Sequence, residues 1–312
     1  MTADERTEWA WSDAPIVLPV SFESREWNAV FVAFYLAEYS GSRLLITHVH
    51  DWAEKHPFEE EFRRDVEELA KEVKVEYDYV TVEPDKIPPS VDEIAKSIVK
   101  TLVDHKAQSI VMSAHREAFF RELFGRVSDH VARLSSRKVL LVETPQQGVR
   151  IPKNPKRIFI PVLKEVHPDP FIIAAALTSS ASVPDVEIVA AKIIQLPPTV
   201  PLDALEMQDT FKKDEKEFSF LTTQAIRSLG RPVTPILFPV REIGDDILDY
   251  LRAKGMDVVV MYSKKQTGFY SFLTKNEYDI VSKAPCIVLV VLPGSQDGEM
   301  GNSQQKEKPL PG

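Results

Sequence analysis

The chain has 312 residues, of which 44% are hydrophobic and 27% charged, and its formal net charge is -9. This composition is that of a globular protein and excludes a disordered chain, and no apolar run approaches the roughly 20 residues that span a bilayer. The acidic balance argues against nucleic-acid binding, because a phosphate backbone attracts basic surfaces. The start of the chain is acidic and polar, unlike a signal peptide, so we expect a cytoplasmic protein without membrane insertion.

The first half of the chain alternates short apolar segments with amphipathic ones, a pattern typical of parallel strands joined by crossover helices. The apolar segments predict five strands, at residues 16–20, 43–50, 75–82, 109–112 and 138–143. The segments between them predict four helices, at residues 26–39, 57–73, 90–105 and 127–134. The third helix opens on Ser90 with Glu93 three residues later, which is the spacing of a capping box.

The second half repeats this plan. The segment APIVLPV at residues 14–20 returns as KRIFIPV at residues 156–162, and the twenty residues from Phe124 match those from Leu273 without a gap. The offset is 142 residues in the first match and 149 in the second, so the second half carries an insertion, which we place between residues 197 and 229. Its strands are predicted at residues 157–162, 186–194, 233–240, 257–262 and 286–291.

An internal repeat of this length predicts two homologous α/β domains, at residues 1–148 and 149–293. The boundary falls in a segment rich in Pro, Gly, Gln and Lys, where the apolar pattern stops. The tail at residues 294–312 has no apolar period, and we predict that it is disordered.

The doubled five-strand plan, and above all the segment FGRVSDHVARLSSRKVLLV, resembles the universal stress protein family in its tandem form. The resemblance runs from Pro15 to Leu292. It implies two flavodoxin-like domains, each a doubly wound, five-stranded parallel sheet, that form a pseudo-twofold pair. It also implies that the last strands of the two domains pair with each other, which makes the chain an intramolecular dimer and removes two apolar edges from solvent.

Nucleotide-binding members of that family carry an Asp after the first strand and a loop G-x-x-G, nine residues, then G-S or G-T after the fourth. Glycines there let backbone N–H groups approach a phosphate at a helix N-terminus. In the first half of this chain, Ser21 stands in place of the Asp, and Ser113 and Arg116 replace the first two glycines. Gly125 remains but is followed by Arg126, in a loop that is one residue short.

The second half departs further from the family pattern. Leu163 stands in place of the Asp, while Tyr262 and Lys265 replace the first two glycines. Thr274 and Lys275 replace the last pair of the motif. Because these side chains lie where the backbone would have to approach a phosphate, we predict that the second half binds no nucleotide.

Two interpretations of the first-half loop stay open. Positive charge gathers there in an acidic protein, on His115, Arg116, Arg121 and Arg126. Since arginine can hold a phosphate where the backbone cannot, the loop is a candidate site for an anion or for an adenine nucleotide such as ATP. The residues of that site would be Ser21, Ser113, Arg116, Gly125, Arg126 and Ser128. The alternation of Arg and Glu equally describes a solvated helix with internal ion pairs, which we favour.

Three other features have a functional and a structural interpretation. His48 and His50, with Asp51 and His56 nearby, have a spacing that could ligate a metal, but ordinary histidines at a strand end are the simpler interpretation, so we expect no metal. Six aromatic residues lie at corresponding places after the fourth strand of each half, where they would fill a vacant cleft or contact a partner: Phe119, Phe120, Phe124, Phe269, Tyr270 and Phe272. The single cysteine, Cys286, is interpreted as buried packing.

The chain shows no nucleophile elbow, no P-loop and no recognisable pair of catalytic carboxylates, so we do not expect an enzyme. The first hypothesis is a non-enzymatic stress-response or regulatory protein that acts through an unknown protein partner, with its nucleotide sites largely lost and no cofactor. The alternative is an adenine-nucleotide sensor with one altered site in the first domain. A further homodimer is left open.

Overall fold

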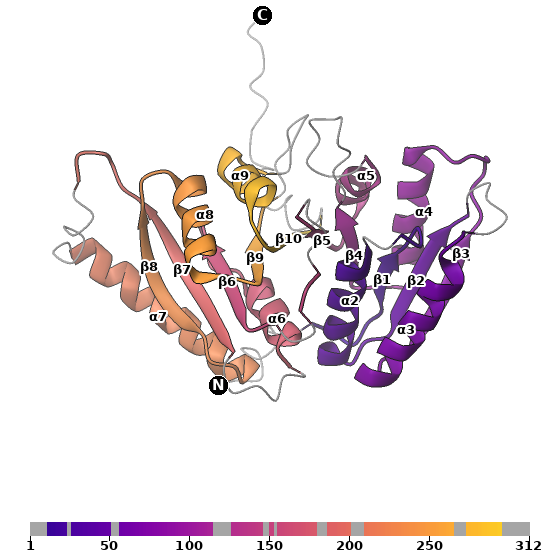
Figure 1. Ribbon diagram of the computed structural model, residues 1–312, viewed down its shortest axis with the longest axis horizontal. Coiled ribbons are helices and arrows are strands. Elements are labelled where there is room, and N and C mark those ends of the chain that lie inside the picture. The colour runs from indigo at the N-terminus through magenta and orange to yellow at the C-terminus, as the bar shows by residue number, and fades with distance from the viewer. Residues whose placement is uncertain are drawn as a thin grey trace, which may run out of the picture.

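The computed structural model describes residues 11–23, 26–50, 56–114, 126–145, 150–152, 155–179, 186–200, 209–264 and 273–294. These residues form one ten-stranded sheet with helices on both faces (Figure 1). The elements of the first half are β1 (Ile16–Pro19), α2 (Trp27–Ser40), β2 (Leu44–Val49), α3 (Glu59–Val73), β3 (Tyr77–Val82), α4 (Val91–Asp104), β4 (Ser109–Ala114), α5 (Arg126–Leu134) and β5 (Lys138–Glu143). The elements of the second half are β6 (Arg157–Val162), α6 (Pro168–Leu177), β7 (Glu187–Gln195), α7 (Asp209–Leu229), β8 (Thr234–Val240), α8 (Ile243–Lys254), β9 (Val258–Tyr262), α9 (Lys275–Lys283) and β10 (Ile287–Leu292).

The sheet has the strand order β3-β2-β1-β4-β5-β10-β9-β6-β7-β8. Each half is therefore a doubly wound, five-stranded parallel unit. The strand order of the second unit is the reverse of that of the first, so the last strands, β5 and β10, lie side by side at the centre of the sheet. Among the described strands, β5 with β10 is the one antiparallel pair. The predicted fold class, the strands and the pairing of the last strands are confirmed.

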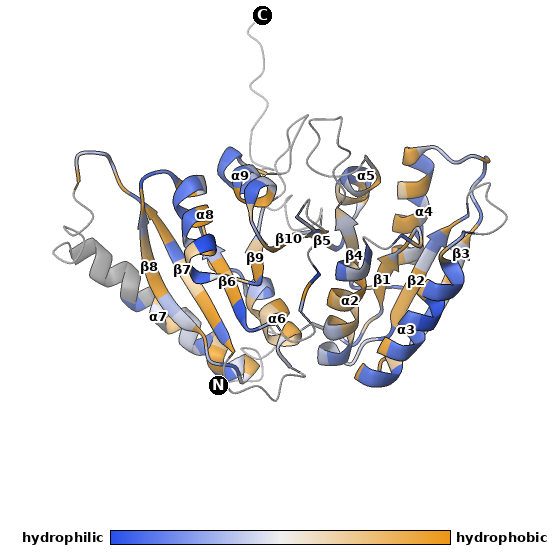
Figure 2. Cartoon of the chain, in the orientation of Figure 1, coloured by the Kyte–Doolittle hydropathy of each residue, from blue (hydrophilic) through white to orange (hydrophobic). Residues whose placement is uncertain are grey.

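The strands near the centre of the sheet are buried on both faces. In Figure 1, α2, α3, α6 and α7 cover one face, and α4, α5, α8 and α9 cover the other. Figure 2 shows the consequence for the sequence, because the strands are mostly hydrophobic while the outer surface of helices such as α3 is hydrophilic. Strands covered on both faces have near-continuous apolar sequences, which is why they could be read from the sequence.

The two halves are joined at the sheet and on the face of α2 and α6. At the junction Leu140 of β5 faces Val291 of β10, and both side chains are buried. Asp169 of α6, which is 1% exposed, accepts hydrogen bonds from Trp11 Nε1 at 2.9 Å and from Lys138 Nζ at 2.8 Å. These contacts connect the second half to both ends of the first half.

Local sequence signals mark the start of α4 and the end of α2. The capping box of α4 is present, with the Ser90 hydroxyl accepting from the Glu93 N–H and the Glu93 carboxylate accepting from the Ser90 N–H. α2 ends at Gly41, whose φ of 70° is left-handed and whose N–H bonds Ala37 O. The insertion of the second half falls in the region of α7, which has 21 residues against 15 in α3.

Within the described residues, no helix is long and apolar enough to cross a membrane. The predicted boundary between residues 148 and 149 lies outside the described residues and stays a prediction. The same holds for the predicted disorder of the tail beyond Gly294.

Candidate functional site

The place to examine in a doubly wound sheet is the crevice at the carboxyl ends of the strands, where the strand order reverses. In this chain the reversal lies between β1 and β4 in the first half and between β6 and β9 in the second. The predicted site residues of the first half follow β1 and β4, so they belong to the first of these crevices.

The turn after β1 is closed by a glutamate of the chain. The carboxylate of Glu26 accepts hydrogen bonds from the Ser21 N–H at 2.8 and 3.0 Å, from Ser21 Oγ at 2.7 Å and from the Glu23 N–H at 3.1 Å. Two backbone donors two residues apart that point at one anion form a nest. Ser21 is a residue of the candidate anion site predicted from the sequence, and its N–H and hydroxyl donors are directed at Glu26.

Glu26 is only 6% exposed, and this controls its ionisation. Burial raises the pKa of the Glu26 carboxyl from 4.5 to about 7, while the hydrogen bonds from Ser21 and Glu23 act in the opposite direction. Near neutral pH the turn thus holds a carboxyl group that is close to its titration midpoint. No sequence motif identified Glu26.

Phe22 fills the space beside this turn. Its φ of 61° is left-handed, which is rare for an aromatic residue, and its side chain is 2% exposed. The Phe22 ring centroid lies 4.7 Å from that of His48, 5.5 Å from His56 and 5.5 Å from Phe62. The carboxyl ends of β1 and β2 are therefore covered by an aromatic cluster of the chain, made of Phe22, His48, His56 and Phe62.

The histidines of this region do not converge on one point. His48 Nδ1 donates to Val20 O at 3.1 Å, whereas His50 Nδ1 lies 2.9 Å from a Glu83 carboxylate oxygen at the end of β3. Asp51 lies outside the described residues. Among the residues that are described, no group of three or more His, Cys, Asp or Glu could hold a metal ion.

The β4 side of the first crevice is described only in part. Ser113 is half-buried near the end of β4, and its hydroxyl has no hydrogen-bond partner in the described structure. Ser128 is buried in the first turn of α5. Arg116 and Gly125 lie outside the described residues, as does the side chain of Arg126, so the predicted anion site remains a prediction.

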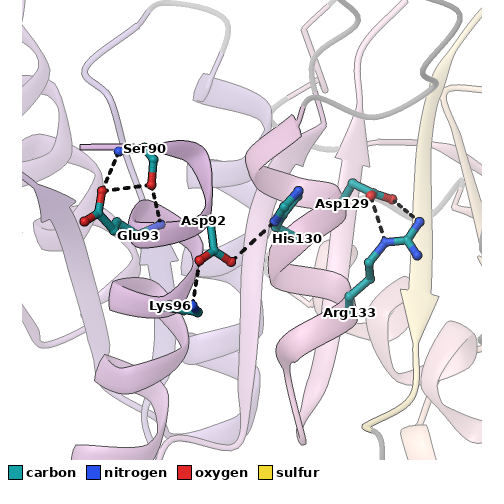
Figure 3. A network of polar contacts seen from close by, with 7 residues as sticks. All are labelled: Ser90, Asp92, Glu93, Lys96, Asp129, His130 and Arg133. Carbon is teal, nitrogen blue, oxygen red and sulfur yellow. Dashed lines mark hydrogen bonds and ion pairs between the residues drawn. The ribbon is translucent and has the colours of Figure 1, made fainter. Parts of the chain in front are cut away.

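Ion pairs lie on the outer surface of α4 and α5, and one of them joins the two helices (Figure 3). Asp92 of α4 lies 2.6 Å from Lys96 Nζ and 3.8 Å from His130 Nδ1 of α5, and Arg133 pairs with Asp129 at 2.9 Å. His130 is thus a surface residue close to a carboxylate. These side chains are at least partly exposed, so the ion pairs contribute little to stability, and none of them uses a group from the crevice.

The crevice of the second half is filled by a pair of stacked rings. The rings of His167 and Tyr262 lie 3.7 Å apart between centroids, with only 7° between their planes. A cavity of about 50 Å³ remains beside them, and Leu163, Lys164 and Thr274 contribute to its lining. Ligand pockets are usually about 300 to 1,000 Å³, so this space is small for a nucleotide.

The mouth of the same crevice carries an ion pair. Lys264 Nζ, which follows β9, lies 2.9 Å from a Glu165 carboxylate oxygen, which follows β6. Both side chains are exposed, so solvent screens the pair and its contribution to stability is small. Lys265 and the predicted aromatic segments of both halves lie outside the described residues.

The N-terminus of α9 is satisfied by the chain itself. The Thr274 hydroxyl accepts from the Glu277 N–H at 3.3 Å, and a Glu277 carboxylate oxygen accepts from the Thr274 N–H at 2.6 Å. This is a second capping box, and its carboxylate is in a residue that is 7% exposed. A helix N-terminus normally favours an anion, and here that place is taken by Glu277.

Cys286 is buried immediately before β10, as predicted. Burial raises the pKa of its thiol to about 12. The thiolate that would be needed for nucleophilic chemistry is therefore disfavoured.

Comparison with known proteins gives a family match for residues 14–143 and a fold for the whole chain. Residues 14–143 match the Universal stress protein family. A universal stress protein structure from Archaeoglobus fulgidus DSM 4304 is similar over 90% of this chain and 98% of its own, with 12% identity and a TM-score of 0.53. The structure of a functionally unknown protein from Pseudomonas aeruginosa PAO1 is similar over 94% of this chain and 95% of its own, with 12% identity and a TM-score of 0.51. The structure of a putative universal stress protein from Pseudomonas aeruginosa UCBPP-PA14 is similar over 93% of this chain and 95% of its own, with the same identity and TM-score. No match was found among curated proteins.

Proposed function

We propose that this chain, whose residues 14–143 match the universal stress protein family, is a non-enzymatic stress-response or regulatory protein that acts in the cytoplasm through contacts with a protein partner. The two domains are residues 1–148 and 149–293. Their nucleotide sites are largely lost, and the intramolecular pairing of β5 with β10 replaces the dimer of two separate chains.

The observation that carries this proposal is that side chains of the chain itself occupy the crevice of the second half and the β1 side of the crevice of the first half. In the first half the donors of Ser21 are bound to Glu26, and Phe22 covers the strand ends. In the second half the stacked rings of His167 and Tyr262 leave about 50 Å³. A nucleotide would have to displace these groups and bring its phosphates close to buried carboxyl groups.

Isothermal titration of the full chain with ATP and magnesium tests the loss of the sites. We expect no saturable heat, whereas a nucleotide-binding protein at 100 times its dissociation constant would also gain about 2.7 kcal/mol of stability. The matched variant is Glu277→Ser, which gives the start of α9 the residue type found at Ser128. The proposal is contradicted if the unmodified chain binds ATP saturably and Glu277→Ser strengthens this binding, because the second half would then hold a working site.

The second candidate function, an adenine-nucleotide sensor, is supported by one asymmetry between the halves. By the offset of 149 residues, Ser128 of α5 corresponds to Glu277 of α9, so this position carries no carboxylate in the first half. The Ser113 hydroxyl, without a partner in the described structure, lies at the same crevice. The proposed ligand groups are Ser21, Ser113, Arg116, Gly125, Arg126 and Ser128.

Arginine variants separate the two functions. If the first half is a sensor, ATP binding weakens in Arg116→Ala and Arg126→Ala by about 1.5 to 3 kcal/mol each, the usual contribution of a charge-assisted hydrogen bond. Arg133→Ala is the control, because Arg133 is bound to Asp129 on the outer surface of α5. ATP binding that is equally weakened by all three changes would indicate unspecific charge attraction. If the unmodified chain does not bind ATP at all, the result favours the first function.

A further inference from the structure

The two edges of the ten-stranded sheet, β3 and β8, differ in the backbone groups that they present. In β3, the Leu44 N–H bonds Glu76 O and the His50 N–H bonds Val82 O, so the even-numbered residues of β3 face β2. Residues of one strand alternate in the direction of their backbone groups. Tyr77, Tyr79 and Thr81 therefore direct their N–H and C=O groups away from the sheet, where the described residues offer them no partner.

The β8 edge cannot accept another strand in the same way. The Leu196 N–H bonds Val240 O, so the even-numbered residues of β8 face β7 and the odd-numbered ones face outward. Two of these outward residues, Pro235 and Pro239, have no N–H group. Proline at such positions is a common way to prevent edge-to-edge pairing. The β3 strand contains no proline and consists mainly of Tyr, Val and Thr, which favour strand pairing.

We infer that β3 pairs with β3 of a second copy of this chain, antiparallel about a twofold axis, in a closed homodimer. A second copy is the fitting partner because it supplies an extended strand with the same open row of donors and acceptors. Pairing of β3 with β8 of another copy would repeat without end and give a filament, and the two prolines of β8 oppose it. The β3 pair closes after two chains.

The sequence of β3 fits one register of this pair. With Tyr79 opposite Tyr79 of the second copy, Tyr77 lies opposite Thr81, and the three outward residues of each strand can exchange hydrogen bonds. Asp78 then lies opposite Val80, so no like charges face each other, and Asp78 is also paired with Arg43 of its own chain at 3.2 Å. A register centred on Asp78 would set two carboxylates opposite each other and is disfavoured.

Sedimentation velocity over a wide concentration range tests the inference. The expected mass is twice the 35.3 kDa of one chain. Thr81→Lys places a charge on the exposed edge of β3, and Thr81→Pro removes an outward N–H; both should shift the protein to the mass of one chain. The matched control is Thr234→Lys, because Thr234 is an exposed threonine of the other edge strand, and it should remain dimeric.

Unfolding curves of the variants distinguish a lost interface from a lost fold. If Thr81→Pro fails to fold, Thr81→Lys decides, since the Thr81 side chain is exposed and makes no core contact. A single-chain mass for the unmodified protein at every concentration overturns the inference. So does a dimer that persists in a folded Thr81→Lys variant, or one that Thr234→Lys dissociates equally well.

Discussion

The variant Glu26→Gln tests whether burial or hydrogen bonding has the larger effect on the pKa of Glu26 in the turn after β1. The Glu26 carboxyl is buried, and its pKa is raised from 4.5 to about 7 because burial outweighs the hydrogen bonds from Ser21 and Glu23. Below pH 4.5 the group is protonated in both the folded and the unfolded chain, so its neutral form is buried without a charge penalty. Between pH 4.5 and about 7 the unfolded chain ionises this group while the folded chain keeps it protonated, so the stabilisation is lost progressively and is gone above the folded pKa.

The size of this effect follows from the pKa difference. One pKa unit corresponds to about 1.4 kcal/mol, so a change from 4.5 to about 7 corresponds to about 3 kcal/mol. Glutamine has the same shape and is neutral at every pH. The free energy of unfolding of Glu26→Gln minus that of the unmodified chain should therefore increase by about 3 kcal/mol between acidic pH and pH above the folded pKa.

Urea unfolding followed by circular dichroism at a series of pH values measures this difference. Glu61→Gln is the matched control, because Glu61 is exposed on α3, and its difference should stay nearly constant. A difference for Glu26→Gln that falls as the pH rises would refute the reasoning. It would mean that the four hydrogen bonds to Glu26 stabilise the carboxylate more than burial penalises it.

Two other changes test the junction and the cysteine. Leu140→Ala should lower the free energy of unfolding by about 2 to 5 kcal/mol, because Leu140 is 1% exposed where β5 meets β10. Val103→Ala, at a residue that is 59% exposed on α4, should change it by less than about 0.5 kcal/mol, and similar effects in urea unfolding would contradict the burial argument. The buried Cys286, with its pKa raised to about 12, should react with a disulfide reagent only after unfolding, so rapid labelling of the folded chain would show that the thiol is accessible.

The sequence was sufficient for the fold because the relevant signals are local and repeated. Strands covered on both faces must be apolar along their whole length, and the helices between them keep one apolar face. The match between the residues from Phe124 and those from Leu273 has no gap, which supported the prediction that the last strands pair; the structure adds the register, with Leu140 opposite Val291.

The contents of the crevices depend on contacts that the sequence does not encode locally. Ser21 in place of an Asp was visible, but its hydrogen bonds to Glu26 were not, and neither was the left-handed φ of Phe22, a conformation that no rule assigns to an aromatic residue. The stack of His167 on Tyr262 joins the N-cap residue of α6 to the end of β9, and the sequence identified Tyr262 only as a replacement of a motif glycine. Only tertiary structure could bring these groups together.

One signal at the crevices was present in the sequence and could have been found. Thr274 and Glu277 have the same spacing as Ser90 and Glu93, and both pairs form capping boxes. A capping box uses the same helix N–H groups that an anion would bind, so a gain of about 1 kcal/mol in helix stability competes directly with ligand binding. In the first half this position is Ser128, and the carboxylate of the first turn of α5, on Asp129, is paired with Arg133 at 2.9 Å on the outer surface. If either half keeps an anion site, the chemistry of the helix start therefore favours the first.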